Sequence, residues 1–188
     1  IPLEEMKQAA LAKPINQDFP FEKALTGEGI RFICECKKAS PSKGVIVEDF
    51  PYLEIAKAYE EAGASALSVL TEPDFFQGEN RFLTEIKQAV SLPVIRKDFI
   101  IDAYQIYEAK FIGADAVLLI ATILNEEELD ALQRLARELG LSALVEAHTE
   151  EELLKALRTN PKMIGVNNRD LKTVKVDIQQ SIRLRALV

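Results

Sequence analysis

The sequence has no tryptophan, a single histidine, two cysteines and no long hydrophobic run. A helix that crosses a membrane needs about 20 consecutive apolar residues, and no basic-then-apolar leader opens the chain. We therefore expect a cytoplasmic protein with no membrane contact. A length of 188 residues suits one domain with a sizeable core.

Basic residues are fewer than acidic residues, and the formal net charge is −7. Proteins that bind nucleic acid need a basic face to contact phosphates, so the composition disfavours a nucleic-acid partner. It leaves room for a small anionic substrate, which responds to local charge. Lysines gathered in one cleft of such an acidic chain would be informative.

The two cysteines, Cys34 and Cys36, lie two residues apart in a predicted strand, so their side chains share one face. Their number and spacing fit neither a disulfide framework nor a zinc site. We expect two small buried thiols in a reducing compartment.

Short apolar runs alternate with longer amphipathic stretches along the whole chain. Runs of this length, rich in Val, Ile, Leu and Ala, are typical of parallel strands buried on both faces. The predicted strands are Phe32–Lys37, Ala66–Thr71, Pro93–Asp98, Ala116–Ala121, Ala143–His148 and Met163–Asn168. The predicted helices are Tyr52–Ala62, Asn80–Ala89, Ala103–Phe111, Asn125–Leu139, Thr149–Leu157 and Gln179–Leu187.

Turn and capping residues support this alternation. Gly63, Gly113 and Gly140 each follow a helical pattern, where a left-handed residue commonly ends a helix. Asn125 and Thr149 each precede a run of glutamates, as expected for the start of a helix.

Repeated strand–helix units leave two architectures open, a doubly wound open sheet and a closed barrel. No Gly-x-Gly-x-x-Gly follows the first strand, which removes support for a dinucleotide-binding open sheet. In a barrel, chemistry collects at the carboxyl ends of the strands. Polar residues are therefore expected at many strand ends.

Four strand ends carry such residues. The residues that share an alternate face there are Glu35 and Lys37 on the first strand, Lys97 on the third, Glu146 and His148 on the fifth, and Asn167 and Arg169 on the sixth. Opposite charges on an apolar strand are costly unless they pair or line a wet cavity. A shared site explains all four ends better than separate structural ion pairs. For His148, the one histidine, the position at the strand end leaves a catalytic role and a structural or rim role open.

Two loops add to this picture. Residues 38–44 are basic and turn-rich, and beside Lys37 they are suited to cover an anionic group. The loop over residues 72–78 contains the adjacent rings of Phe75 and Phe76, which could contact an aromatic part of a substrate.

Four motifs in this order resemble indole-3-glycerol phosphate synthase, a (β/α)8-barrel (TIM barrel) enzyme of tryptophan biosynthesis. They are Glu-Cys-Lys-Lys-Ala-Ser-Pro-Ser over 35–42, Leu-Thr-Glu-Pro-Asp-Phe-Phe-Gln-Gly over 70–78, Leu-Pro-Val-Ile-Arg-Lys-Asp-Phe over 92–99 and Gly-Val-Asn-Asn-Arg-Asp-Leu over 165–171. The resemblance covers essentially Phe19 to Val188. It implies an α/β fold and a lyase that decarboxylates and dehydrates 1-(2-carboxyphenylamino)-1-deoxyribulose 5-phosphate, with no metal or organic cofactor.

The resemblance also implies roles for individual residues. Lys97 would be the general acid, Lys37 would hold the anionic groups and share acid work, and Glu146 would be the general base. Glu35 and Asn167 would position the intermediate.

Further residues would bind the substrate. Phe76 and Phe99 would contact its aromatic ring, and Ser40 would take part in binding. Arg169 would support the site by pairing with a neighbouring carboxylate.

The sequence departs from the family pattern in length. A (β/α)8 barrel typically needs about 250 residues, whereas 188 residues supply only about six strand–helix units. We expect one barrel domain over 1–188 that lacks the last two units and their phosphate-binding turns, with a shortened helical extension over 1–30. The open first and sixth strands would then favour self-association. We expect the chain to be part of a longer protein.

Two alternatives stay open. A catalytically incomplete fragment would act only as a folding or assembly unit. A sister isomerase of the same pathway would share the barrel, but the Lys97–Phe99 and Asn167–Asp170 segments argue against it, and fold alone does not decide function.

Overall fold

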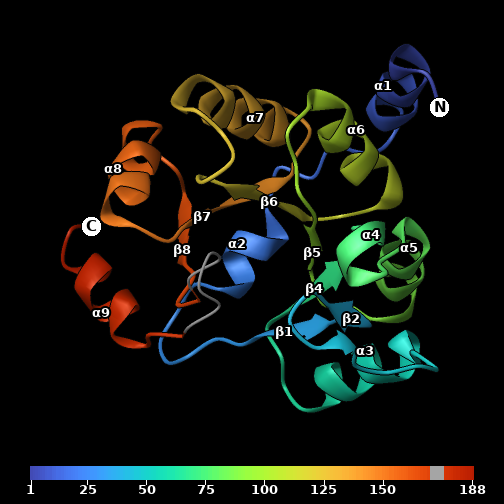
Figure 1. Cartoon of the computed structure of the whole chain (residues 1–188). Helices are drawn as coiled ribbons and strands as arrows, with labels where there is room; N and C mark the ends of the chain where they lie inside the picture. The colour runs from blue at the N-terminus through green and yellow to red at the C-terminus, as the bar shows by residue number, and fades with distance from the viewer. Residues whose placement is uncertain (170–175) are drawn as a thin grey trace.

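The computed structural model describes residues 1–169 and 176–188 (Figure 1). The predicted motif over 165–171 therefore extends beyond the described residues at Asp170 and Leu171. Figure 1 shows a curved sheet in the middle of the molecule, with most helices arranged around it.

The sheet contains six parallel strands in the spatial order β1-β4-β5-β6-β7-β8. Their bounds are β1 Ile33–Cys36, β4 Ala66–Leu70, β5 Val94–Lys97, β6 Ala116–Ile120, β7 Ser142–Ala147 and β8 Met163–Val166. All six predicted strands are confirmed, each within two residues at either end. Neighbours along the chain are neighbours in space, as repeated right-handed crossovers produce.

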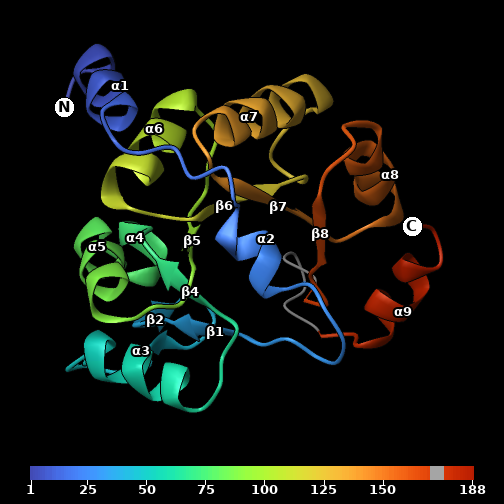
Figure 2. The same ribbon diagram turned by 180° about the vertical axis from the view of Figure 1, so that it is seen from behind.

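A helix of at least seven residues follows each of the strands β1, β4, β5, β6, β7 and β8, and together these helices surround the sheet (Figure 2). Their bounds are α3 Tyr52–Glu61, α5 Asn80–Ala89, α6 Ala103–Ile112, α7 Glu126–Glu138, α8 Glu150–Arg158 and α9 Gln179–Arg185. The six predicted helices are thus confirmed. Asn125 and Thr149 each make a reciprocal capping box with the glutamate three residues later. Gly113 ends α6 at φ +94°, a left-handed conformation that glycine adopts without steric cost.

Alternate residues of the strands β4 to β8 enter two different hydrophobic clusters. One face packs against the surrounding helices and includes Leu67, Val69 and Val117. The opposite, inner face contributes Ala66, Ile95 and other side chains to a second cluster around Phe21. Phe21 belongs to the short helix α2 (Pro20–Ala24), which Figures 1 and 2 show in the middle of the molecule, enclosed by the curve of the sheet.

The N-terminal 30 residues contain α2 and, before it, α1 (Leu3–Leu11). The ammonium group of buried Lys110 on α6 donates a hydrogen bond of 2.7 Å to the carbonyl of Pro14. Burial lowers the pKa of Lys110 from its ordinary value. This contact fixes the segment between the two helices against the outside of the barrel wall.

Two predicted loops contain regular structure instead. Residues 38–44 lie in and around a small antiparallel hairpin, in which β2 (Ala39–Ser40) pairs with β3 (Gly44–Val45). The Phe75–Phe76 pair lies in a one-turn helix, α4 (Pro73–Phe76). The expectation of a loop there is wrong, because the Glu72 side chain accepts three backbone N–H groups and so starts a helix.

Phe21 tests the inner cluster. Its side chain is fully buried, so Phe21→Ala should lower the free energy of unfolding by about 3–5 kcal/mol because it leaves a cavity. Urea denaturation measures the change. Phe32→Ala is the matched control: its ring is 61% exposed, and a loss within about 0.5 kcal/mol is expected. Equal losses in the two variants would contradict this packing.

Candidate functional site

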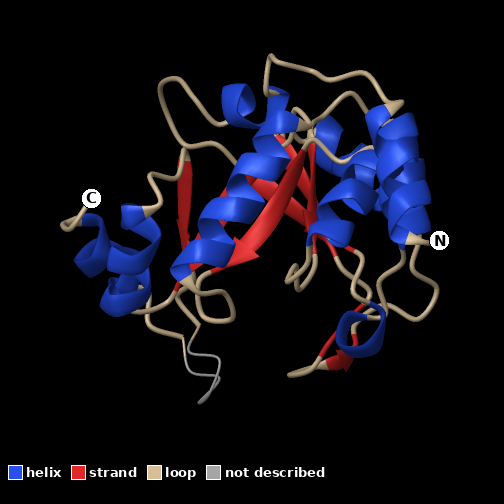
Figure 3. Cartoon of the chain, turned by 90° about the horizontal axis from the view of Figure 1, so that it is seen from above, coloured by secondary structure: helices blue, strands red, loops and turns tan. Residues whose placement is uncertain are grey.

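The carboxyl ends of six parallel strands meet at one end of the molecule. In Figure 3 the strand arrows point toward the end at which the β2–β3 hairpin lies. Loops that follow parallel strands therefore converge there, which is where barrel enzymes place their chemistry. Every predicted site residue within the described range lies in or just beyond such a strand end.

The charged residues at these ends face the inner side of the sheet. Lys97 follows Ile95 by two residues, and Glu146 follows Leu144 by two, and both apolar residues belong to the inner cluster. Because side chains alternate along a strand, Lys97 and Glu146 point the same way. Glu35 pairs in register with Ser68, which follows the inner residue Ala66 by two.

Glu35 is the centre of an ion-pair cluster, hereafter the Glu35 cluster: Glu35, Lys37, Ser68 and Lys97. Lys37 Nζ lies 2.6 Å from Glu35 Oε1, and Lys97 Nζ lies 3.7 Å from Oε2. The hydroxyl of Ser68 donates to Oε2 at 3.3 Å. One carboxylate therefore contacts two ammonium groups from different strands.

These ion pairs add little to stability. The three charged side chains are about 30% exposed, and partly solvated pairs contribute only about 0–1 kcal/mol. They matter more for the electrostatic potential at the strand ends. Two ammonium groups there attract an anionic ligand and can donate protons. The Glu35 cluster is therefore suited to bind and protonate an oxygen-rich substrate.

A second polar contact joins the strands β7 and β8. Asn167 Nδ2 donates to Glu146 Oε1 at 3.1 Å, so the predicted base and the predicted positioning amide lie side by side. This hydrogen bond orients the Glu146 carboxylate. The structure thus groups the predicted catalytic residues into the Glu35 cluster and the Glu146–Asn167 pair.

Aromatic rings lie next to these strand ends. The ring centroid of Phe99 lies 6.3 Å from that of Phe76, and the two ring planes are tilted by 49°. It also lies 6.3 Å from the centroid of Phe75, with the rings edge to face. The Phe99 side chain is 40% exposed, so its ring is accessible to a ligand. Glu72 fixes α4, because its carboxylate accepts the N–H groups of Asp74, Phe75 and Phe76.

Ser40 and Arg169 lie less centrally. Ser40 is buried in the β2–β3 hairpin. Arg169 Nη1 donates to the hydroxyl of Ser42 at 3.4 Å, which joins the end of β8 to the hairpin that follows β1. Its pairing with a carboxylate stays a prediction, since the described residues do not include its neighbours 170–175.

His148 lies beside α8. Its ring is buried, with Nδ1 3.7 Å from Glu152 Oε2. Within residues 1–169 and 176–188 neither ring nitrogen has a hydrogen-bond partner. The strand β7 ends at Ala147, so strand alternation does not set the direction of His148.

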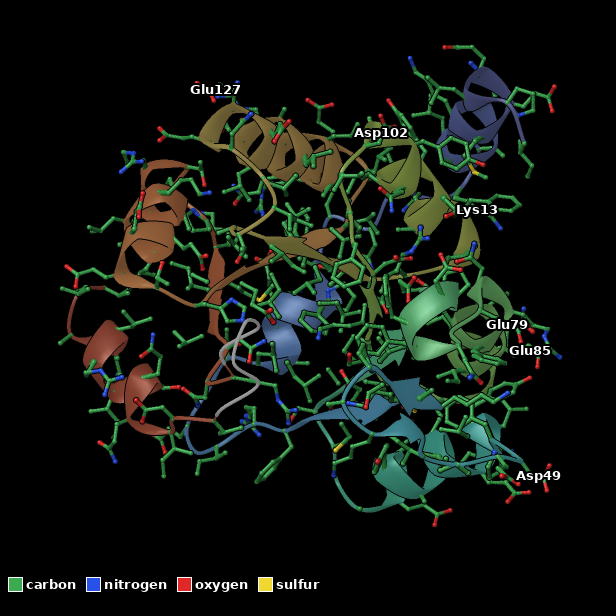
Figure 4. The ribbon with its side chains drawn as sticks, viewed as in Figure 1. Lys13, Asp49, Glu79, Glu85, Asp102 and Glu127 are labelled. Carbon is green, nitrogen blue, oxygen red and sulfur yellow. The ribbon has the colours of Figure 1, made fainter. Side chains whose placement is uncertain are left out.

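Sequence reasoning missed Ser68, Thr71 and the outward neighbours of Lys97. Ser68 could have been found, because it is the one hydroxyl in phase with Ala66 on a strand that otherwise reads as apolar. Figure 4 places the acidic residues Asp49, Glu79, Glu85, Asp102 and Glu127 at the periphery of the molecule.

The family comparison agrees with this geometry. A family model described as indole-3-glycerol phosphate synthase matches residues 1–188. The chain belongs to this family. An indole-3-glycerol phosphate synthase of Ruminiclostridium cellulolyticum is 57% identical over 178 residues, which cover 94% of this chain and 68% of the relative. That of Lachnoclostridium phytofermentans is 50% identical over 199 residues, covering 100% and 73%.

Solved structures show the fold at much lower identity. One described as "Native KDPGal structure" matches with a TM-score of 0.56 and 13% identity, covering 87% of this chain and 69% of the other. A methylornithine synthase matches with a TM-score of 0.56 and 14% identity, over 88% and 64%. Together with the family, the curved parallel sheet identifies a TIM-barrel wall of six strand–helix units.

Residues 1–169 and 176–188 contain no group of three or more His, Cys, Asp or Glu side chains that could hold a metal ion. None of the helices described is long and apolar enough to cross a membrane.

The thiols that flank Glu35 give a test of the packing at the site. Burial, with smaller effects of Cys34 and Glu35, raises the pKa of Cys36 to about 12, so at pH 8 its unreactive thiol form prevails. In a Cys34→Ser variant, iodoacetamide at pH 8 should leave Cys36 unmodified in the folded chain and alkylate it in urea. Mass spectrometry reads the result. Equal rates in both states would contradict the burial of Cys36.

Proposed function

We propose that this protein closes the indole ring of 1-(2-carboxyphenylamino)-1-deoxyribulose 5-phosphate, releasing carbon dioxide and water to give indole-3-glycerol phosphate. The observation that carries the proposal is the Glu35 carboxylate shared by Lys37 and Lys97 at the strand ends. Family membership supports the same reaction. The fragment and the sister-isomerase alternatives gain no comparable support.

Substrate binding uses the groups around the Glu35 cluster. Lys37 pairs with anionic groups of the substrate, and Ser40 and Arg169 contribute from the hairpin and the end of β8. Phe76 and Phe99 contact the carboxyphenyl ring through their faces and edges. Holding both ends of a flexible substrate brings the ring carbon to the ketone, which supplies much of the rate.

Lys97 acts as the general acid in ring closure. The ring carbon that bears the carboxylate forms a bond to the ketone carbon, and the electrons of the C=O bond move to oxygen. Lys97 donates its proton to that oxygen, which removes the developing negative charge. Glu35, 3.7 Å from Lys97 Nζ, directs the ammonium group and stabilises its charge before transfer.

Carbon dioxide and water leave in the following steps. The bond from ring carbon to carboxylate breaks, and its electron pair restores the aromatic ring. The new hydroxyl leaves as water after protonation by a lysine ammonium group. Glu146 then removes a proton from the carbon next to the one that lost the hydroxyl, which forms the C=C bond of the five-membered ring. Asn167 keeps the Glu146 carboxylate oriented through their 3.1 Å hydrogen bond.

The same proposal covers the setting of the reaction. The substrate is a small phosphorylated anion, the enzyme is cytoplasmic, and the residue types at the site suffice for acid–base chemistry without a cofactor. Residues 1–188 supply six strand–helix units of one barrel domain, with a shortened helical extension over 1–30.

Lys97→Ala tests the role of the general acid. Loss of a positioned acid should lower kcat by about 10²–10⁴-fold, measured by the fluorescence of the indole product. Lys87→Ala is the matched control: Lys87 also forms an ion pair, with Asp115 at 2.5 Å, but on the outer face near the amino ends of the strands. It should keep kcat within about twofold.

The assay is run on the 188-residue chain and on a fusion that adds the C-terminal region of the Ruminiclostridium cellulolyticum relative. Absence of turnover in both would refute the proposed reaction. Unchanged turnover in Lys97→Ala would refute the role of Lys97 and leave the reaction standing.

A further inference from the structure

A buried polar network lies on the outer side of the sheet at the end of β5. It is formed by Thr71, Arg96, Asp98 and Glu108. The guanidinium of Arg96 is 4% exposed, and it lies on the outer side of the sheet, next to α6. The network lines a cavity of about 470 Å³. Such groups are costly to bury unless each is paired, so their pairing is informative.

All three guanidinium nitrogens of Arg96 donate hydrogen bonds to its neighbours. Nη2 donates to Asp98 Oδ2 at 2.9 Å and to Glu108 Oε2 at 2.6 Å, and Nη1 donates to the carbonyl of Gln105 at 3.0 Å. Nε donates to Thr71 Oγ1 at 3.0 Å. The planar fork of the guanidinium thereby fixes the end of β5 to α6 and to the end of β4.

Thr71 contacts three consecutive residues of the neighbouring strand end. Its hydroxyl accepts from Arg96 and donates to Asp98 Oδ2 at 2.6 Å. Its backbone N–H donates to the carbonyl of Lys97 at 3.1 Å. Lys97, which lies between Arg96 and Asp98, is therefore held to Thr71 through its backbone carbonyl.

The direction of Lys97 follows from this arrangement. Side chains alternate along a strand, so fixing Arg96 on the outer face of β5 turns Lys97 to the inner face. There its Nζ lies 3.7 Å from Glu35 Oε2. Asp98 extends the fixed segment by one residue, because its Oδ1 accepts the N–H of Phe99 at 2.8 Å.

The amino end of the same strand offers a comparison. Asp115 accepts the N–H of Val94 at 2.8 Å and pairs with Lys87 at 2.5 Å. This contact fixes the start of β5 with one carboxylate and one lysine. The end of β5 carries a much denser network, although buried ionic groups are seldom the most stabilising solution. Accurate placement of Lys97 accounts for the difference.

We propose that Thr71 is a positioning residue for catalysis: through Arg96 and Asp98 it sets the direction of Lys97 toward the reacting oxygen. This inference rests on the proposed function, since it assigns Lys97 the acid role. A misplacement of about 1 Å can cost about 100-fold in rate, so a lost hydroxyl should act on kcat more than on KM.

Three variants test the proposal in the indole fluorescence assay. Thr71→Val keeps the shape and removes the hydroxyl, and Thr71→Ser keeps the hydroxyl. Asp115→Asn weakens the contact at the other end of β5. We expect Thr71→Val to lower kcat by about 10–100-fold with KM within about threefold. Thr71→Ser should restore kcat to within about threefold, and Asp115→Asn should keep it, even where its melting temperature falls as far as that of Thr71→Val.

Other outcomes separate the two proposals. Equal kcat losses in Thr71→Val and Asp115→Asn, or in Thr71→Val and Thr71→Ser, would assign Thr71 a general structural role and overturn the inference. So would unchanged kcat in Thr71→Val. If Thr71→Val does not fold by circular dichroism, Asp98→Asn replaces it, with the same expected loss of kcat. Absence of turnover in the unmodified protein refutes the proposed function itself.

Discussion

The candidate site depends on one carboxylate that two lysine side chains share. The ammonium groups of Lys37, after β1, and Lys97, on β5, repel each other, and Glu35 offsets that repulsion by contacting Lys37 at 2.6 Å and Lys97 at 3.7 Å. The register of the sheet makes this contact, because Glu35 pairs with Ser68 and Leu70 pairs with Lys97. A shift of the strand register by one residue would turn these side chains toward the surrounding helices. Their charges would then be buried away from solvent.

The strands and helices were predictable because their signals are local. Six apolar runs and the glycines between them placed every strand of the sheet, and the capping boxes at Asn125 and Thr149 placed two helix starts. Strand alternation also placed Glu35, Lys97 and Glu146 on a common face. The sequence motifs supplied the family, which the comparisons confirm.

The rest depends on contacts between distant residues. Arg96 and Asp98 read in sequence as part of one charged run with Lys97, and their partners Thr71 and Glu108 lie 25 and 12 residues from Arg96. No local pattern identifies such partners. The helix α4 was missed for a related reason: Glu72 looks like a loop residue until its carboxylate is seen to accept three N–H groups. Roles for individual site residues are likewise proposals from motif and geometry.

A crystal structure with a substrate analogue, in which the ketone is reduced to an alcohol, tests the central claim most directly. The claim predicts that the alcohol oxygen lies within hydrogen-bond distance of Lys97 Nζ and that the carboxyphenyl ring contacts Phe76 and Phe99. An analogue bound in the cavity behind β5, beside Arg96 and Glu108, with Lys97 still contacting only Glu35, would contradict it.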